Sequence, residues 1–289
     1  TYCFNWQKLN YYLTQISPQN AQGEYYLTDV IKMFVDNQLI VRSNITEKIE
    51  EVLGINDRVT LAKMAKIIRE QINEELMISG ITIIDPEATY IDSGVKIGLD
   101  TVIYPNTIIE GESIIGINCR LGPNSHIVNT IIGDNTEVTF SSVIDSKIAN
   151  HCSVGPFSRI REKAVINDKC KIGNFVELKK TVLEEGVKAS HLAYLGDAEI
   201  GTKTNIGAGT ITCNYDGKNK HKTIIGSNVF VGSNSTLIAP LTLESDTYIA
   251  AGSAITATVP THSLGVGRAR QKNIENWVLR KREKDNVGK

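Results

Sequence analysis

The stretch from Ile91 to Ile127, IDSGVKIGLDTVIYPNTIIEGESIIGINCRLGPNSHI, carries an aliphatic residue at every sixth position. Neither an α-helix, with its period of 3.6, nor a simple strand, with its period of two, produces this spacing. The period returns after a slip of phase and returns again in the last third of the chain. The aliphatic positions are Ile91, Ile97, Ile103, Ile109, Ile115, Leu121 and Ile127, then Ile132, Val138, Ile144, Ile148, Val154, Ile160, Ile166, Ile172 and Leu178, and later Ile225, Val231, Leu237, Leu243, Ile249 and Ile255.

Each hexad predicts one short strand and a turn, and glycine often follows the aliphatic residue, which suits a chain that turns sharply. Three hexads make a triangular coil of about 18 residues, and stacked coils bury an aliphatic column that no single coil could bury. We therefore predict an all-β main domain, a parallel β-helix over residues 81–258. At about 4.8 Å per coil, roughly ten coils give a prism about 48 Å long. The period alone does not set its handedness.

The regions before, within and after the repeat that lack the period of six have other sequence patterns. Apolar residues at helical spacing in a charged background predict a connector helix over residues 58–80. Residues 1–57 are rich in aromatic side chains, lack the period of six and are expected to be part of another domain. Residues 259–289 form a basic tail, with eight basic against three acidic residues from Arg268 onward. Between Ile206 and Ile225 the polar segment AGTITCNYDGKNKHKT breaks the repeat, and we expect it to protrude as a loop.

Charge and cysteine content narrow the classes of function. The formal net charge of −1 gives no basic field, so small molecules are expected as partners rather than nucleic acid or a membrane. Apolar runs are too short to cross a bilayer, and a cytoplasmic location is expected. The cysteines have no CxxC spacing, which argues against disulfides and a thiolate metal site. They are Cys3, Cys119, Cys152, Cys170 and Cys213, of which Cys213 is the alternative candidate for a nucleophile.

Four segments inside the repeat resemble one family, the bifunctional N-acetylglucosamine-1-phosphate uridyltransferase/glucosamine-1-phosphate acetyltransferases. These segments are GPFSRIR (155–161), GNFVELKK (173–180), ASHLAYLGDAEIG (189–201) and NIGAGTITCNYDG (205–217). Two earlier segments, NAQGEYYLTDV (20–30) and EVLGINDRVTLA (51–62), are similar to the end of that family's α/β nucleotidyltransferase domain. The resemblance implies acetyl transfer from acetyl-CoA to glucosamine 1-phosphate, a step toward UDP-N-acetylglucosamine and cell-wall precursors.

The family's glycine-rich GxGTRM-type nucleotide segment has no match in this sequence. We therefore expect an N-terminally truncated chain with a complete acetyltransferase half and no uridyltransferase activity. Asn56 matches a magnesium-binding position of the family, but its partner acid lies in the missing part, so we expect no competent magnesium site. The resemblance also implies a left-handed β-helix, an exception to the usual right-handed crossover, and a homotrimer with sites between subunits.

The resemblance assigns roles to residues at matching positions. His191 is the expected general base, since imidazole can accept a proton near neutral pH, and Glu177 is a candidate to orient its ring. Substrate-binding positions fall on Arg161 and Lys179 for the phosphate, Tyr194 and Asn205 for the sugar, and Lys220 in the predicted loop. Positions for acetyl-CoA fall on Ala208, Asn214, Tyr215, Ser233, Ala251 and Arg268. A backbone N–H near Ala208 is a hypothetical donor to the thioester oxyanion.

Three other hypotheses about the function remain open at this point. Trimeric left-handed β-helices also include zinc-dependent carbonic anhydrases, which need three histidines at a subunit interface. The remaining histidines, which are His126, His151, His221 and His262, match no catalytic position of the acetyltransferase family. Another hexapeptide acyltransferase, with a different donor or amino sugar, is the nearer alternative. A trimeric scaffold without catalysis is the third.

Overall fold

The computed structural model describes residues 1–47 and 52–287, in two compact units, Thr1–Lys66 and Ile67–Lys289. The first unit holds α1 (Trp6–Leu13) and α2 (Thr28–Asp36). The side chain of Asn5 caps α1 by accepting a hydrogen bond from the Lys8 N–H at 3.2 Å. On α2, Val30 and Phe34 are buried, so this unit has a very small core.

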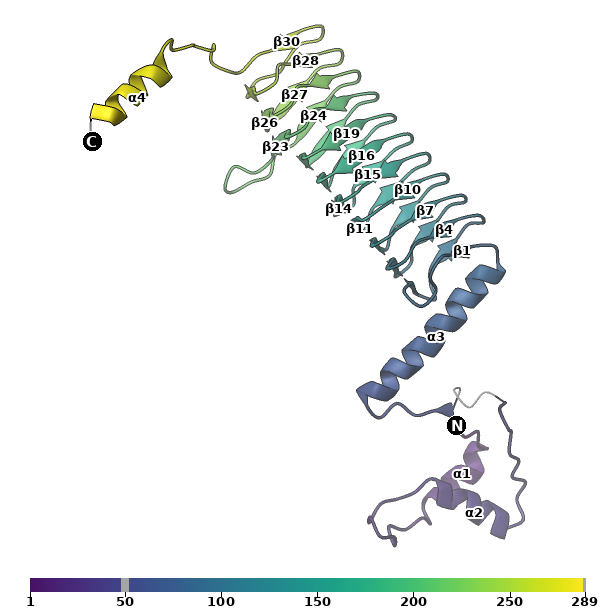
Figure 1. The fold of residues 1–289 in the computed structure, drawn as a ribbon. Helices are drawn as coiled ribbons and strands as arrows, with labels where there is room; N and C mark the ends of the chain where they lie inside the picture. Colours follow the sequence, from purple (N-terminus) through teal and green to yellow (C-terminus); the bar gives the residue numbers. More distant parts are fainter. Residues whose placement is uncertain (48–51, 288–289) are drawn as a thin grey trace. The chain divides into compact units, whose positions relative to one another are not determined.

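The second unit is a prism of short strands in three parallel sheets, in which each strand pairs with the strand one coil away (Figure 1). Sheet A consists of β1 (Thr82–Ile83), β4 (Val102–Ile103), β7 (Arg120–Leu121), β10 (Glu137–Val138), β13 (Ser153–Val154), β16 (Lys171–Asn174), β19 (Lys188–His191), β22 (Asn205–Ile206), β25 (Phe230–Val231), β28 (Tyr248–Ile249) and β30 (Leu264–Gly265). Sheet B consists of β2 (Tyr90–Ile91), β5 (Ile108–Glu110), β8 (His126–Val128), β11 (Ser142–Ile144), β14 (Arg159–Arg161), β17 (Glu177–Lys179), β20 (Tyr194–Gly196), β23 (Ile211–Cys213), β26 (Thr236–Ile238) and β29 (Ala254–Ile255). Sheet C consists of β3 (Lys96–Ile97), β6 (Ile114–Ile115), β9 (Ile131–Ile132), β12 (Lys147–Ile148), β15 (Val165–Ile166), β18 (Val182–Leu183), β21 (Ala198–Ile200), β24 (Thr223–Ile225) and β27 (Leu241–Leu243). The predicted fold is confirmed: the prism is a left-handed parallel β-helix of about ten turns.

The predicted inward residues fill the interior of the prism, with one correction. Ile160 and Leu178, for example, pair in register and are fully buried. At the slip of phase, however, Val143 is the buried residue and Ile144 is only half-buried, so the prediction for Ile144 was wrong. Val143 pairs with Ile127 and Ile160 of the neighbouring coils, because the turn after Val138 is one residue shorter than a full hexad.

The connector helix corresponds to α3 (Arg58–Ile78), and the division between the two units falls within it, after Lys66. In its second half, the buried side chain of Asn73 donates hydrogen bonds to the Pro86 carbonyl at 2.9 Å and the Thr89 carbonyl at 3.1 Å. These bonds tie the helix to the first coil and satisfy carbonyls that have no preceding coil to pair with. A fourth helix, α4 (Trp277–Val287), lies in the basic tail. Among the described helices, none is both long and apolar enough to cross a membrane.

Candidate active site

His191 lies on a corner of the prism, where the chain passes from sheet A to sheet B. Strand pairing places His191 of β19 directly beside Asn174 of β16, one coil earlier. The register continues through β22, β25 and β28, so Ala208, Ser233 and Ala251 occupy the same corner in the next three coils. We call these five residues the corner column. Arg268 ends it, since its guanidinium donates a hydrogen bond to the Ala251 carbonyl at 2.9 Å.

The imidazole of His191 is exposed and is held from one side only. Its Nδ1 lies 2.7 Å from the Oδ1 of Asn174. Because an amide oxygen only accepts, the neutral ring donates from Nδ1 and keeps the lone pair of Nε2 free. The arrangement therefore presents Nε2 as a proton acceptor, in the tautomer that a general base requires.

The predicted partner of the imidazole was wrong. Glu177 accepts a hydrogen bond from the Arg161 Nε at 2.7 Å, and it also lies 3.9 Å from Arg159. This carboxylate raises the pKa of the Arg161 guanidinium, through the hydrogen bond first and through its charge second. Sequence reasoning missed Asn174, although it follows Ile172 by two positions, just as His191 follows Ala189 in the next coil. The equal spacing of Asn174 and His191 from their inward-facing residues could have identified Asn174 from the sequence.

Lys179 lies at the next corner, where the chain passes from sheet B to sheet C, and only 6% of it is exposed. Its Nζ is 3.6 Å from the Glu162 carboxylate and 4.0 Å from that of Asp197. Asp197 also accepts a hydrogen bond from the Asn214 side chain at 2.5 Å. Two carboxylates thus compensate a buried ammonium, which is costly to bury alone.

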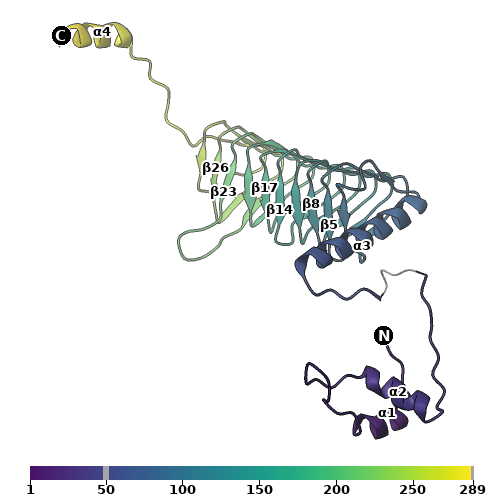
Figure 2. The ribbon, with the colours of Figure 1, turned by 60° about the horizontal axis from the view of Figure 1, so that its bottom comes forward.

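Lys220 reaches this cluster from the loop between β23 and β24, which projects from the prism (Figure 2). The predicted protruding segment was too long, because its residues 211–213 pair in sheet B as β23. Close contact with the Lys179 side chain lowers the pKa of Lys220, and the positive charge of Lys179 lowers it further. Beside the pair is a cavity of about 290 Å³ lined by Lys180, Asp197, Lys220, His221 and Lys222. Two adjacent ammonium groups suit a ligand with two negative charges, such as a phosphate monoester.

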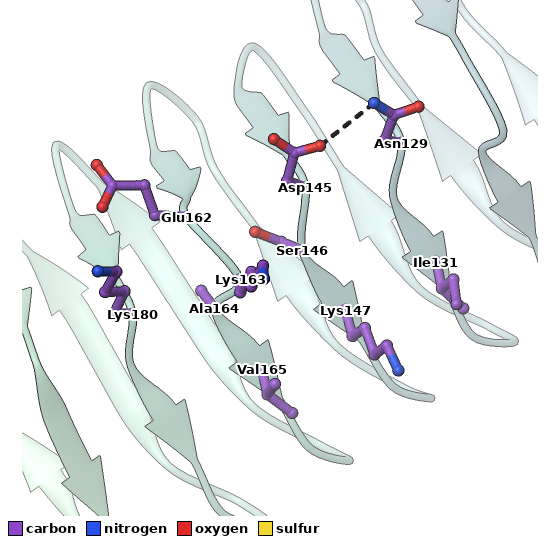
Figure 3. A pocket seen from close by; sticks show the side chains of 10 residues that line it. All are labelled: Asn129, Ile131, Asp145, Ser146, Lys147, Glu162, Lys163, Ala164, Val165 and Lys180. Carbon is purple, nitrogen blue, oxygen red and sulfur yellow. Dashed lines mark hydrogen bonds between the residues drawn. The ribbon is translucent and has the colours of Figure 1, made fainter.

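A larger groove of about 890 Å³ lies on sheet C (Figure 3). Its lining residues are Asn129, Ile131, Asp145, Ser146, Lys147, Glu162, Lys163, Ala164, Val165 and Lys180. In Figure 3 they come from successive coils, and the Asn129 side chain donates to Asp145 at 3.3 Å. None of the corner-column residues lines this groove, so it borders the Lys179 cluster without containing the candidate base.

The other predicted residues are divided between the two corners. Tyr194 lies on sheet B in register with Glu177, and a Cβ built on Gly196 would lie 2.5 Å from its hydroxyl. Asn214 and Tyr215 lie at the start of the protruding loop, on the side of Lys179. Asn205 lies on sheet A, paired with Lys188. Within one chain, the candidate base His191 therefore lies at one corner with four of the predicted acetyl-CoA positions. The cationic side chains predicted to bind the phosphate lie near Tyr194 at the other corner.

Asn56 lies just before α3 and is exposed. Its neighbour Asp57 caps that helix by accepting a hydrogen bond from the Thr60 N–H at 2.6 Å. Over residues 1–47 and 52–287, no three or more His, Cys, Asp or Glu residues gather as a metal site would require. The described residues therefore do not fit a magnesium ion at Asn56, and no chemical step is assigned to one.

Comparison with known proteins finds two matching family models and several similar sequences. Residues 116–204 match the family model "GlmU-like, C-terminal hexapeptide", and residues 222–257 match "Hexapeptide repeat of succinyl-transferase". The bifunctional protein GlmU of Geobacillus sp. (strain WCH70) is 51% identical over 280 residues, which are 97% of this chain and 61% of that protein. The bifunctional protein GlmU of Clostridioides difficile (strain 630) is 48% identical over 288 residues, 100% of this chain and 63% of the relative.

Among solved structures, the UDP-N-acetylglucosamine O-acyltransferase (LpxA) of Moraxella catarrhalis RH4 matches with a TM-score of 0.36 and 17% identity, over 68% of this chain and 80% of that one. The chain spans about three fifths of the length of the two GlmU relatives. It is thus a homologue of the bifunctional GlmU proteins, with a GlmU-like C-terminal hexapeptide domain.

Proposed function

We propose that this protein is a glucosamine-1-phosphate N-acetyltransferase that uses acetyl-CoA. The observation that carries the proposal is the corner column, in which His191 has a free Nε2 and Arg268 forms the other end. The relatives' name, bifunctional protein GlmU, agrees with it. The product, N-acetylglucosamine 1-phosphate, would serve UDP-N-acetylglucosamine and peptidoglycan synthesis in the cytoplasm.

The chemistry requires a neutral amine. The amine nitrogen attacks the thioester carbonyl while Nε2 of His191 accepts its proton. The tetrahedral intermediate then collapses, the C–S bond breaks, and the thiolate of CoA leaves with the electron pair. The Nδ1–H···O bond to Asn174 holds the ring through both protonation states. We keep the backbone N–H near Ala208 as the proposed donor to the oxyanion.

Acetyl-CoA would extend along the corner column. Three coil spacings of about 4.8 Å separate His191 from Ala251, so the part of the corner column between His191 and Arg268 is roughly 14 Å long. The acetyl group would lie at His191, and the anionic nucleotide end would lie toward the guanidinium of Arg268. Ala208 and Ser233 lie between them on the same corner, in the position of the ligand's middle portion.

The Arg268→Ala substitution should raise the KM for acetyl-CoA at least about 10-fold, because a charge-assisted hydrogen bond contributes about 1.5 kcal/mol at its low end. The KM for glucosamine 1-phosphate should stay unchanged. Steady-state kinetics with each substrate varied in turn measures both values. Arg270→Ala removes the same charge two residues away and should behave as wild type; equal effects of the two variants would refute a specific role for Arg268.

The sugar phosphate would bind between the two corners, with Arg161, Lys179 and Lys220 near its phosphate and Tyr194 and Asn205 near its sugar. We infer a homotrimer whose sites form between subunits, because Asn214 and Tyr215 lie away from the corner column within one chain. Beside the column runs a ladder of exposed apolar side chains, with the Phe157 and Phe175 rings stacked at 5.4 Å. A neighbouring copy would cover this ladder.

The deciding experiment is incubation of the protein with acetyl-CoA and glucosamine 1-phosphate, without added metal, while the release of free CoA thiol is followed. We expect release that depends on both substrates. Light scattering of the same sample reports whether a trimer is present. A folded trimer that releases no thiol would reject the acetyltransferase and favour the scaffold.

A further inference from the structure

The loop that carries Lys220, residues 214–222, is a small hairpin. Tyr215 and Lys220 form an antiparallel bridge, and the His221 N–H donates to the Asn214 carbonyl at 2.8 Å. The hairpin leaves the prism after β23 and returns at β24, and its tip projects away from the sheets (Figure 2). Its shape therefore depends largely on contacts within the loop itself.

Asp216 organises the tip of this hairpin. Its Oδ1 accepts hydrogen bonds from the backbone N–H groups of Lys218 at 2.8 Å and Asn219 at 2.6 Å. Its Oδ2 lies 2.7 Å from the Nε2 of His221, which donates to it. The Asn219 N–H, followed by the His221 bond, lowers the pKa of Asp216 to about 2. The carboxylate is thus charged at any physiological pH, and the two side chains fasten the tip to the returning strand.

This fastening bears on Lys220, the residue directly before His221. Lys220 lines one cavity with Asp197, whose carboxylate lies 4.0 Å from the Lys179 ammonium, and the two neighbouring ammonium groups repel each other. The loop is exposed, so repulsion alone would favour a conformation with Lys220 turned away into water. The charged groups that line the same cavity as His221 are Lys180, Asp197, Lys220 and Lys222, and only Asp197 among them is negative. Asp197 and Glu162 attract the Lys220 ammonium and offset part of this repulsion, and contacts inside the loop add a second restraint that does not depend on the cluster.

We propose that His221 and Asp216 are positioning residues, which form a clasp that holds Lys220 beside Lys179 before substrate binds. The clasp preforms the pair of cations for the phosphate of the amino-sugar phosphate. This inference rests on the proposed function for its substrate. It differs from that proposal in assigning a role to two residues that touch neither substrate but fix the conformation of one that does.

The kinetic test uses His221→Ala, His221→Gln and Lys218→Ala in the full chain. His221→Ala should raise the KM for glucosamine 1-phosphate about 10-fold, with kcat and the KM for acetyl-CoA near wild type. His221→Gln keeps an N–H that can donate to Asp216 and should restore most of the affinity. Lys218→Ala removes a positive charge at the tip of the same loop, outside the clasp, and should have no effect on either KM.

A second readout does not depend on catalysis. Without substrate, amide hydrogen exchange of a peptide covering residues 214–222 should be faster in His221→Ala than in wild type, and His221→Gln should restore protection. Unchanged exchange in His221→Ala, or an unchanged KM in an active enzyme, would overturn the clasp. If wild type itself transfers no acetyl group, the proposed function fails while the exchange experiment still decides whether the clasp orders the loop.

Discussion

His191→Ala is expected to lower kcat by about 10²- to 10⁴-fold, the range that general-base catalysis contributes. Of the five corner-column residues, only His191 has a side chain that can take up the proton of the glucosamine 1-phosphate amine near neutral pH. Both KM values should change little, because the imidazole acts on the reacting nitrogen and not on the phosphate or the nucleotide. The free energy of unfolding should stay within about 0.5 kcal/mol of wild type, since the His191 side chain is exposed.

The measurement is thiol release at saturating substrates, with circular dichroism to confirm the fold. His151→Asn is the matched control: His151 is another exposed histidine on the prism, and asparagine tolerates its left-handed φ of 55°. We expect wild-type kcat for this variant. A folded His191→Ala protein with more than a tenth of wild-type kcat would remove His191 from the mechanism.

The period of six was enough to predict the fold, because inward positions in a β-helix are set by local spacing and by burial. Ile160 and Leu178 follow the repeat and are buried as expected. The spacing failed where a turn lost one residue, so that Val143 took the place predicted for Ile144. A shortened turn is decided by pairing with the coils on either side, and this information lies about 17 residues away in the sequence.

The candidate site was predicted less completely, for the same physical reason. His191 and Ala208 lie on one corner because Ala189 pairs with Ile206 in register. The resemblance named these residues without explaining their alignment. The hydrogen-bond partners of the charged side chains and of the imidazole could not be predicted from the sequence. Glu177 accepts a hydrogen bond from Arg161, and Asn174 is the partner of the imidazole. Choosing among several nearby polar side chains requires the distances between coils.

Gly173 shows how closely these coils approach beside the site. A Cβ built on it would lie 1.9 Å from the carbonyl oxygen of Ser190 and 2.6 Å from the carbonyl carbon, both backbone atoms of the next coil. The glycine is therefore required for space. Asn174 follows Gly173 and His191 follows Ser190, so this close approach of β16 and β19 lies next to the hydrogen bond that orients the imidazole.

Gly173→Ala should accordingly lower the free energy of unfolding by about 1–3 kcal/mol, the usual cost of forcing extra volume into a packed site. It should also lower kcat at least 10-fold, because β16 and β19 must move apart where Asn174 holds His191. Denaturant unfolding and thiol release measure the two effects. Gly54→Ala is the control, since a Cβ there meets no atom within 4 Å. Wild-type stability with lowered kcat would mean that the methyl group disturbs only the corner, whereas wild-type values for both would show that the coils can separate without cost to the site.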